Sequence, residues 1–292
     1  MSARRVLGVI GGSGLYELDG LANVRHEKVM TPFGAPSDAL VVGDLGEVRL
    51  VFVPRHGRDH QLSPSEVPYA ANLHALKQLG AEFVLSVSAV GSLREEIHPG
   101  HVVLPDQLID RTRSRRSSFF GDGAVGHISF ADPFCESFRH LVLHAAEGAE
   151  AKVHPSGTLV VMEGPAFSTR AESHLYRSWN AHIIGMTALP EAKLAREAEL
   201  CYATVALCTD YDCWRQDEEA VTVDTVVAVL KRNVELARNI VRKTAERVAH
   251  AKPRTCPCTR ATDYAVMTKN LGKEAAERLY LILGRHLPPP AQ

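Results

Sequence analysis

VLGVIGGSG, residues 6–14, joins a short apolar run to a glycine-rich turn. Glycine interrupts the apolar run after about five residues, too few for a signal-peptide core or a membrane span, so the run predicts a buried strand. Glycines let the backbone turn sharply and present amides to a ligand, and Ser13 adds a hydroxyl. No Gly-Lys-Ser/Thr follows, and Glu17 takes the third glycine position of the dinucleotide fingerprint. By itself the segment fits an anion-binding loop and a plain tight turn equally well.

Further apolar runs follow, separated by segments with helical spacing. They are rich in Val, Ile and Leu without clean alternation, which is typical of strands covered on both faces. The predicted strands are VLGVI (6–10), VRLVFV (48–53), FVLSVSAV (83–90), VVLP (102–105), GTLVVME (157–163), HIIGM (182–186) and YATVALCT (202–209). The predicted helices cover 68–80, 133–149, 173–179 and 190–200. This alternation predicts an α/β fold: a single domain with a central, mixed and twisted β-sheet flanked by helices.

The C-terminal part of the chain has a different organisation. Residues 222–250 have the spacing of one long amphipathic helix, which the segment KPRTCPCTRATDY then ends. We therefore expect a main domain over residues 1–250 and a C-terminal extension over 251–292. The extension should contain the Cys-Pro-Cys segment, one further helix and a disordered tail, LPPPAQ.

The chain has six cysteines: Cys135, Cys201, Cys208, Cys213, Cys256 and Cys258. The simplest interpretation is reduced, mostly buried thiols. A single Cys-x-Cys pair supplies too few ligands for a zinc site, so we predict no metal. A disulfide of Cys256 or Cys258, local or longer-range, remains open.

Bulk charge argues against two classes of partner. The chain has 33 basic and 34 acidic residues, so no net field draws it to nucleic acid or to a membrane surface. An anionic ligand must instead be held by a few placed cations and amides. With no targeting signal visible in the sequence, we expect a cytoplasmic protein.

Polar segments follow several predicted strands, where ligands bind in α/β sheets. Arg55-His56-Gly57-Arg58-Asp59-His60 is a cationic cluster, and an arginine fork fits two phosphate oxygens. A metal site there would need another ligand, and a solvated loop is the other alternative. Ser86, Ser88 and Ser92 offer hydroxyls to phosphate or ribose, whereas the missing G-x-S-x-G motif argues against a serine nucleophile.

Three later strand ends also carry polar or aromatic groups. The turn EGPAFS displays Phe167 either for stacking on a base or for burial in the core. Thr187 can donate to an anion, and Met186 can lie along a sugar. Asp210 and Asp212, two residues apart, suit a ligand rich in donors such as a 6-aminopurine, with helix capping as the alternative.

Together these segments resemble the methylthioadenosine phosphorylase branch of the trimeric purine nucleoside phosphorylase family. The resemblance covers roughly residues 6 to 245 in a consistent order. It rests on IGGSGLYE, TPFGAPSD, PRHGRDHQLSPSEVPYAAN, GSLREEIHPG, IDRTRSR, ADPFC, EGPAFSTRAES, MTALPEAKLAREAELCYATVA and TDYDCW. Beyond residue 250 it becomes loose, although the Cys-Pro-Cys segment is similar to a CxC tail of some heat-adapted relatives. That similarity keeps a Cys256–Cys258 or Cys135–Cys201 disulfide open.

The resemblance implies where the ligands bind. It assigns the phosphate to Ser13, Arg55, His56, Ser88, Ala89 and Thr187. It assigns the purine to Phe167, Thr209, Asp210 and Asp212, and the ribose to Met186. In the family, the 5′ pocket is apolar and is completed by a neighbouring subunit. It corresponds here to His127 (as the residue donated by the neighbour), Val223, Val226 and His60.

The activity implied is phosphorolysis of 5′-methylthioadenosine to adenine and 5-methylthioribose 1-phosphate. Asp210 and Asp212 are the catalytic candidates. Asp210 would give or share a proton at purine N7, and burial together with the neighbouring Asp212 would raise the pKa of Asp210 for this role. Phosphate is a co-substrate and no cofactor is expected. The expected partners are the nucleoside and phosphate, with a homotrimer or a dimer of trimers as the assembly. The alternatives are a phosphorylase for methylthioinosine or purine nucleosides in general, and a non-catalytic nucleoside-binding protein.

Overall fold

The computed structural model describes residues 4–12, 14–215 and 223–287, with only the backbone of 223–232. The seven predicted strands are all present. They are β1 (Arg5–Gly11), β4 (Val48–Pro54), β5 (Phe83–Ser92), β6 (Val102–Val103), β9 (Thr158–Met162), β10 (Ile183–Gly185) and β11 (Cys201–Asp210). Four more strands were not predicted: β2 (Ala22–Glu27), β3 (Leu40–Leu45), β7 (Gln107–Arg111) and β8 (Val153–His154). β2 and β7 are largely solvent-exposed and therefore have no apolar run to reveal them.

The predicted helices are also confirmed, with small shifts at their ends. They are α1 (Tyr69–Gln78), α2 (Glu136–Ala146), α3 (Arg170–Ser178), α4 (Ala188–Glu197), α5 (Val223–Ala249) and α6 (Lys273–Leu283). Two short 3-10 helices, η1 (Pro257–Arg260) and η2 (Gly284–His286), lie in the C-terminal extension. The tail predicted to be disordered lies, except for Leu287, outside the described residues.

All the strands form one mixed sheet, as predicted. Its main path is β2-β3-β4-β1-β5-β10-β9-β7, and β11 pairs with both β5 and β6. Strands β4, β1, β5 and β11 run parallel to one another, so their carboxyl ends meet at one edge of the sheet. β3 runs antiparallel to β4, and β10 runs antiparallel to the end of β5. Polar segments from distant parts of the sequence are thereby brought to a single edge.

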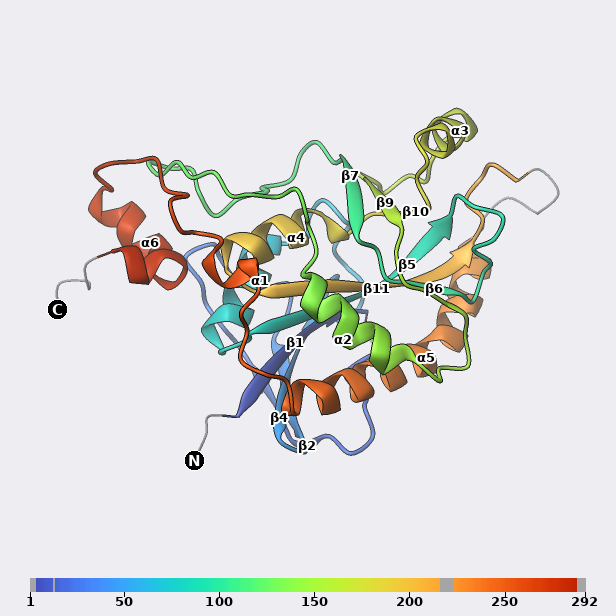
Figure 1. Ribbon diagram of the computed structural model, residues 1–292, viewed down its shortest axis with the longest axis horizontal. Coiled ribbons are helices and arrows are strands. Elements are labelled where there is room, and N and C mark those ends of the chain that lie inside the picture. The colour runs from blue at the N-terminus through green and yellow to red at the C-terminus, as the bar shows by residue number, and fades with distance from the viewer. Residues whose placement is uncertain (1–3, 13, 216–222, 288–292) are drawn as a thin grey trace.

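Helices cover both faces of the sheet (Figure 1). On one face Leu73 of α1, Leu194 of α4 and Leu279 of α6 share a core with the strands. On the other face Phe138 of α2 and Ile240 of α5 share a second core. This double coverage explains the continuous apolar runs of the central strands. Among the described helices, none has the length and apolar composition needed to span a lipid bilayer.

Candidate active site

A cavity of about 720 Å³ opens at the sheet edge where β1, β4, β5 and β11 end. It lies where ligands bind in sheets of this type. Eleven of the residues proposed from the sequence line it: Arg55, His56, His60, Ser88, Ala89, Phe167, Met186, Thr187, Thr209, Asp210 and Asp212. The tertiary structure thus brings the proposed phosphate, sugar and base groups to one cavity.

Four proposed residues are not placed there. Ser13 lies outside the described residues, although its neighbours Gly12 and Gly14 line the cavity. The side chains of Val223 and Val226, at the start of α5, are also outside the described part of the chain. His127 is described, and it is exposed and absent from the lining of this cavity.

Arg55 is part of a buried ion pair. Its Nε donates to Glu191 Oε1 at 2.6 Å, its Nη1 donates to Val87 O at 3.1 Å, and its Nη2 donates to Ser86 Oγ at 2.7 Å. The Arg55 and Glu191 side chains are only 3% and 1% exposed. An arginine has five N–H donors, so most of them point into the protein here. Arg55 therefore lines the cavity but keeps few donors for an anion.

Glu191 lies in the helix predicted over residues 190–200 and was not among the site residues proposed from the sequence. Its Oε2 accepts hydrogen bonds from Ser86 Oγ and from Tyr202 Oη, both at 2.8 Å. A buried carboxylate needs a cation and several donors to remain charged, and this network supplies both. No pattern in the sequence pairs Arg55 with Glu191, because 136 residues separate them.

His56, which also lines the cavity, is held as a neutral ring. Its Nδ1–H donates to Leu62 O at 2.8 Å, and its ring stacks on that of His60 with centroids 4.5 Å apart. Burial, with the charge of Arg55 adding to it, lowers the pKa of His56 to about 4. Near neutral pH the other nitrogen, Nε2, is therefore an acceptor that matches a protonated phosphate oxygen.

The lining of the cavity also contains the carboxylate pair Asp210 and Asp212. Asp210 accepts hydrogen bonds at both oxygens, from Thr209 Oγ1 at 2.6 Å and from Asp212 N at 2.8 Å. Burial raises the pKa of Asp212 to about 6, and the charge of Asp210 adds to the rise. The raised pKa makes Asp212 a carboxyl that can hold a proton beside Asp210.

An irregularity in β11 sets the direction of this pair. Its register against β5 shifts between Cys208 and Asp210, so that Asp210 faces Gly91. A β-bulge of this kind redirects side chains at a strand end. A side chain at Gly91 would bring a Cβ to 3.0 Å from Asp210 Oδ1. The absence of a side chain at Gly91 therefore leaves room for the carboxylate.

Aromatic and apolar groups also line the cavity. Phe167 is 52% exposed, which excludes the alternative that it is a core residue. Val234 and Ala237 show that α5 lines the cavity, although one or more turns beyond the residues proposed from the sequence. The amphipathic pattern of α5 predicted a buried face but not what that face would contact.

Arg115 fixes the walls of the cavity without lining it. Its side chain is 1% exposed. Its Nη1 donates to Met186 O and Leu189 O, at 2.5 and 2.7 Å, and its Nη2 donates to Glu163 O at 2.5 Å. It therefore joins the segments that follow β9 and β10, which carry Phe167 and Met186. The motif IDRTRSR contains this arginine, but its contacts depend on tertiary structure.

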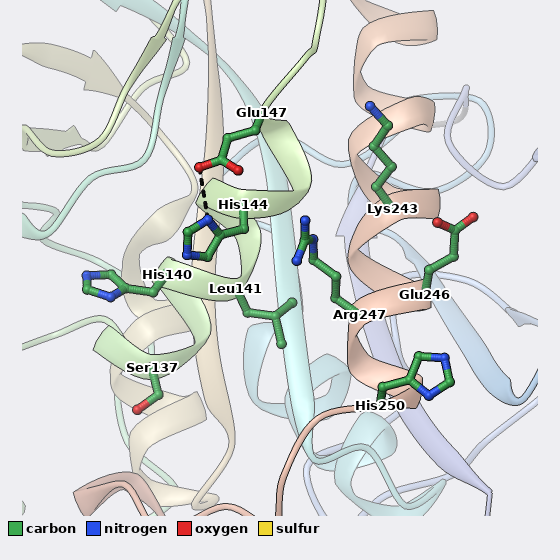
Figure 2. A pocket seen from close by; sticks show the side chains of 9 residues that line it. All are labelled: Ser137, His140, Leu141, His144, Glu147, Lys243, Glu246, Arg247 and His250. Atoms are coloured by element: carbon green, nitrogen blue, oxygen red, sulfur yellow. Dashed lines mark hydrogen bonds and ion pairs between the residues drawn. The ribbon is translucent and has the colours of Figure 1, made fainter.

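A second hollow lies between α2 and α5, away from all these groups. Figure 2 shows side chains of both helices around it, including Arg247, Lys243 and the hydrogen-bonded pair His144–Glu147. His144 and Glu147 are 56% and 62% exposed. The hollow is a solvated surface groove, and no strand end reaches it. We therefore take the cavity at the sheet edge as the active site.

The cysteines are reduced and mostly buried, as the sequence predicted. All six are free thiols, with no disulfide between any of them. Cys135, Cys201, Cys256 and Cys258 nevertheless form a four-cysteine cluster, in which the Sγ atoms lie within 4.8 Å of one another. The Cys-Pro-Cys segment alone has two thiols, and the fold brings two more beside it from remote positions.

Comparison with known proteins agrees with this geometry. The family model described as the phosphorylase superfamily matches residues 6–246. An S-methyl-5′-thioadenosine phosphorylase of Geobacter sulfurreducens is 54% identical over 97% of this chain and 99% of its own length. One of Gloeobacter violaceus is 52% identical over 96% of this chain and 95% of its own.

Two solved structures show the same fold. A methylthioadenosine phosphorylase from an antarctic soil metagenomic library has a TM-score of 0.91 and 45% identity, covering 98% of this chain and 100% of its own. The methylthioadenosine phosphorylase of Schistosoma mansoni in complex with adenine has a TM-score of 0.80 and 39% identity, covering 85% and 93%.

Proposed function

The chain belongs to the phosphorylase superfamily, among the S-methyl-5′-thioadenosine phosphorylases, and we propose that it catalyses the reaction named for them. In this reaction inorganic phosphate cleaves S-methyl-5′-thioadenosine to adenine and 5-methylthioribose 1-phosphate. The observation that carries the proposal is one cavity whose lining includes both Arg55, His56 and Thr187 (the anion end) and the carboxylate pair Asp210 and Asp212 (the carboxylate end).

The anion end suits inorganic phosphate. Thr187 immediately precedes α4 and makes no capping hydrogen bond with its hydroxyl, so that hydroxyl is available to a phosphate oxygen. Ser88 offers a second hydroxyl from β5. The glycine loop, which follows the end of β1, offers backbone amides to the same cavity. Neutral His56 would accept a hydrogen bond from a phosphate hydroxyl. Arg55, whose guanidinium is buried beside it, would contribute positive charge.

The carboxylate end suits adenine. Phe167 offers an exposed ring for stacking on the base. Asp210 and Asp212 can accept from the 6-amino group and supply a proton to N7, which makes adenine a better leaving group. Since burial raises the pKa of Asp212 beside Asp210, we assign the movable proton to the pair and not to Asp210 alone.

Bond cleavage follows from these two ends. As the glycosidic bond lengthens, the sugar becomes oxocarbenium-like, and the negative charge of phosphate on the opposite face stabilises that cation. A phosphate oxygen then attacks C1′. No pair of glycosidase-type carboxylates is needed, because phosphate is itself the nucleophile. Met186 and Ala89 also line the cavity and would contact the ribose. The proposed chemistry uses phosphate as co-substrate and requires no cofactor.

The 5′ pocket is proposed to be completed between subunits of a homotrimer, or of a dimer of trimers. His127 lies outside the cavity of its own chain, on a segment whose neighbours Val125 and Met267 are 52% and 60% exposed. Met267 N donates to Val125 O, so these apolar side chains lie close together. Such a patch fits burial against another subunit. We further propose a cytoplasmic location and a division into residues 1–250 and the extension.

The proposal is tested by product analysis with methylthioadenosine, methylthioinosine, adenosine and inosine, each with and without phosphate. We expect phosphate-dependent release of adenine from methylthioadenosine to be fastest, because the carboxylate pair matches a 6-amino group. Faster cleavage of a 6-oxopurine nucleoside would contradict the assignment of the base. Binding without phosphorolysis would make the chain a nucleoside-binding protein.

A further inference from the structure

The four-cysteine cluster joins three distant parts of the chain. Cys135 precedes α2, Cys201 begins β11, and Cys256 and Cys258 belong to the segment of η1. Cys135, Cys201 and Cys258 are at most 3% exposed, and Cys256 is half-buried. The proposed reaction uses none of them, and the cluster lies outside the catalytic cavity.

The spacing of the sulfur atoms is that of a metal site. Tetrahedral zinc bonds sulfur at roughly 2.3 Å, which places two sulfur ligands about 3.8 Å apart. Here Cys256 Sγ lies 3.7 Å from Cys135 Sγ and 3.3 Å from Cys201 Sγ. A disulfide would require about 2.05 Å. Four thiolates also leave no open position, as in structural and not catalytic zinc sites.

We propose that the four-cysteine cluster binds one structural zinc ion, which fastens the C-terminal extension to α2 and β11. Four soft sulfur ligands in a tetrahedral arrangement favour zinc over the hard cations magnesium and calcium. The ion would crosslink residues 135, 201 and 256–258, with no need for an oxidising compartment.

The surroundings suit the double negative charge of a zinc tetrathiolate. Arg254 Nη1 lies 3.9 Å from Cys201 Sγ, and the guanidinium of Arg196 also acts on Cys258 electrostatically. Cys135 occupies the N-terminal cap of α2, where the helix dipole is positive. Positive groups around thiolate ligands stabilise the charged site.

Metal binding would organise more than η1. Beyond it, His127 N donates to Ala265 O, and Gly126 pairs with Val266 in a β-bridge. The extension therefore supports the segment that carries His127. Zinc would act on the proposed 5′ pocket only through this positioning, and that second consequence rests on the proposed function.

The experiment measures metal directly on full-length protein purified without chelators. We expect about one zinc per chain by elemental analysis. Cobalt added to the chelated, reduced protein should give thiolate-to-metal charge-transfer bands and the d–d bands of tetrahedral coordination. Cys256→Ser and Cys258→Ser should each lose both signals. The matched control is Cys208→Ala, which removes a buried thiol of β11 outside the cluster and should retain the metal.

Stability provides a second readout, independent of activity. Chelation should lower the Tm of the wild-type protein and of Cys208→Ala, but not that of Cys258→Ser, because only the first two have metal to lose. Reduced protein that binds neither zinc nor cobalt would overturn the proposal. So would iron bound in place of zinc, or thiol titration in denaturant showing the four cysteines paired as disulfides in freshly purified protein.

Discussion

At the scale of single residues, the site depends on which side chains already use their hydrogen-bonding groups within the protein and which can still bind a ligand. Arg55 is the most obvious anion ligand in the sequence, yet Glu191 and Ser86 hold its guanidinium. Removing it would leave the Glu191 carboxylate buried without its cation, which typically costs about 3–5 kcal/mol. Arg55→Ala therefore tests folding as much as phosphate binding, and a different residue must report on the anion.

Thr187 is that residue. We expect Thr187→Ala to raise the KM for phosphate roughly 10- to 100-fold, since a hydrogen bond to a charged group contributes about 1.5–3 kcal/mol. Steady-state kinetics with phosphate varied at saturating nucleoside would measure it. Thr187→Ser keeps the hydroxyl and serves as the control. An unchanged phosphate KM in Thr187→Ala would remove Thr187 from the anion site.

Asp210 is expected to act on the leaving group. Asp210→Asn should lower turnover of methylthioadenosine by on the order of 10²–10⁴, because an amide cannot take part in proton transfer to N7. Single-turnover kinetics would separate this loss from product release. Near-normal turnover in the folded variant would show that the purine leaves without help from this side chain.

The raised pKa of Asp212 leads us to expect that kcat/KM depends on pH. Its pKa of about 6 is raised, so the protonated form is populated below pH 6 and is lost as the pH rises through that value. If the pair carries the proton for N7, kcat/KM should fall on the alkaline side of about pH 6. Asp212→Asn should lack or shift that limb, while the titration of phosphate itself remains in both profiles. Identical profiles would assign the limb to phosphate alone.

At the scale of elements, strand ends and the contacts between them shape the cavity. The register shift in β11 turns Asp210 toward Gly91, and Asp212 adopts a left-handed φ of 52° just beyond it. Arg115 holds the ends of β9 and β10 by hydrogen bonds to three carbonyl groups. The positions of Phe167 and Met186 therefore depend on a residue that touches neither ligand.

Arg115→Lys tests that positioning. An ammonium group cannot reproduce the planar fork, so several buried carbonyls lose their donors. We expect the free energy of unfolding to fall by about 2–4 kcal/mol and the nucleoside KM to rise more than the phosphate KM. Arg116→Lys is the control, because Arg116 is 48% exposed and pairs with Asp122 at the surface. Equal effects on both KM values would indicate a general loss of structure.

At the scale of the whole molecule, the C-terminal extension and the segment of His127 form a unit outside the cavity. α6 packs in the core shared with α1 and α4, while Val125, Tyr264 and Met267 remain largely exposed. An isolated chain therefore presents an apolar surface beside a histidine that its own active site does not use. Assembly with another subunit would cover that surface and give the histidine a ligand to contact.

Subunit complementation tests this arrangement. We expect His127→Ala to raise the KM for methylthioadenosine about ten-fold, equivalent to about 1.4 kcal/mol of lost binding. Co-expression with Asp210→Asn chains under separate tags should then recover activity above the sum of the two parents. Mixed assemblies contain sites with an intact Asp210 from one chain and an intact His127 from the next. Activity that merely adds would place His127 within its own subunit.

Much of the fold follows from local pattern. The central strands and the helices were predicted because burial on both faces produces apolar runs, and burial on one face produces helical periodicity. β2 and β7 were missed because solvent-exposed strands depend on pairing with neighbours, such as β2 with β3. The proposed residues that line the cavity could be named from the sequence because they lie near or beyond the ends of predicted strands, in segments with a family resemblance.

The sequence by itself determined the α/β alternation and the residue types at the strand ends, since both depend on short-range order along the chain. The tertiary structure decided which other groups each of those residues contacts. It paired Arg55 with Glu191, placed the raised pKa on Asp212, and collected Cys135 and Cys201 beside the Cys-Pro-Cys segment. The physical reason is the same in each case: burial, charge pairing and metal geometry depend on distances in space between residues far apart in sequence.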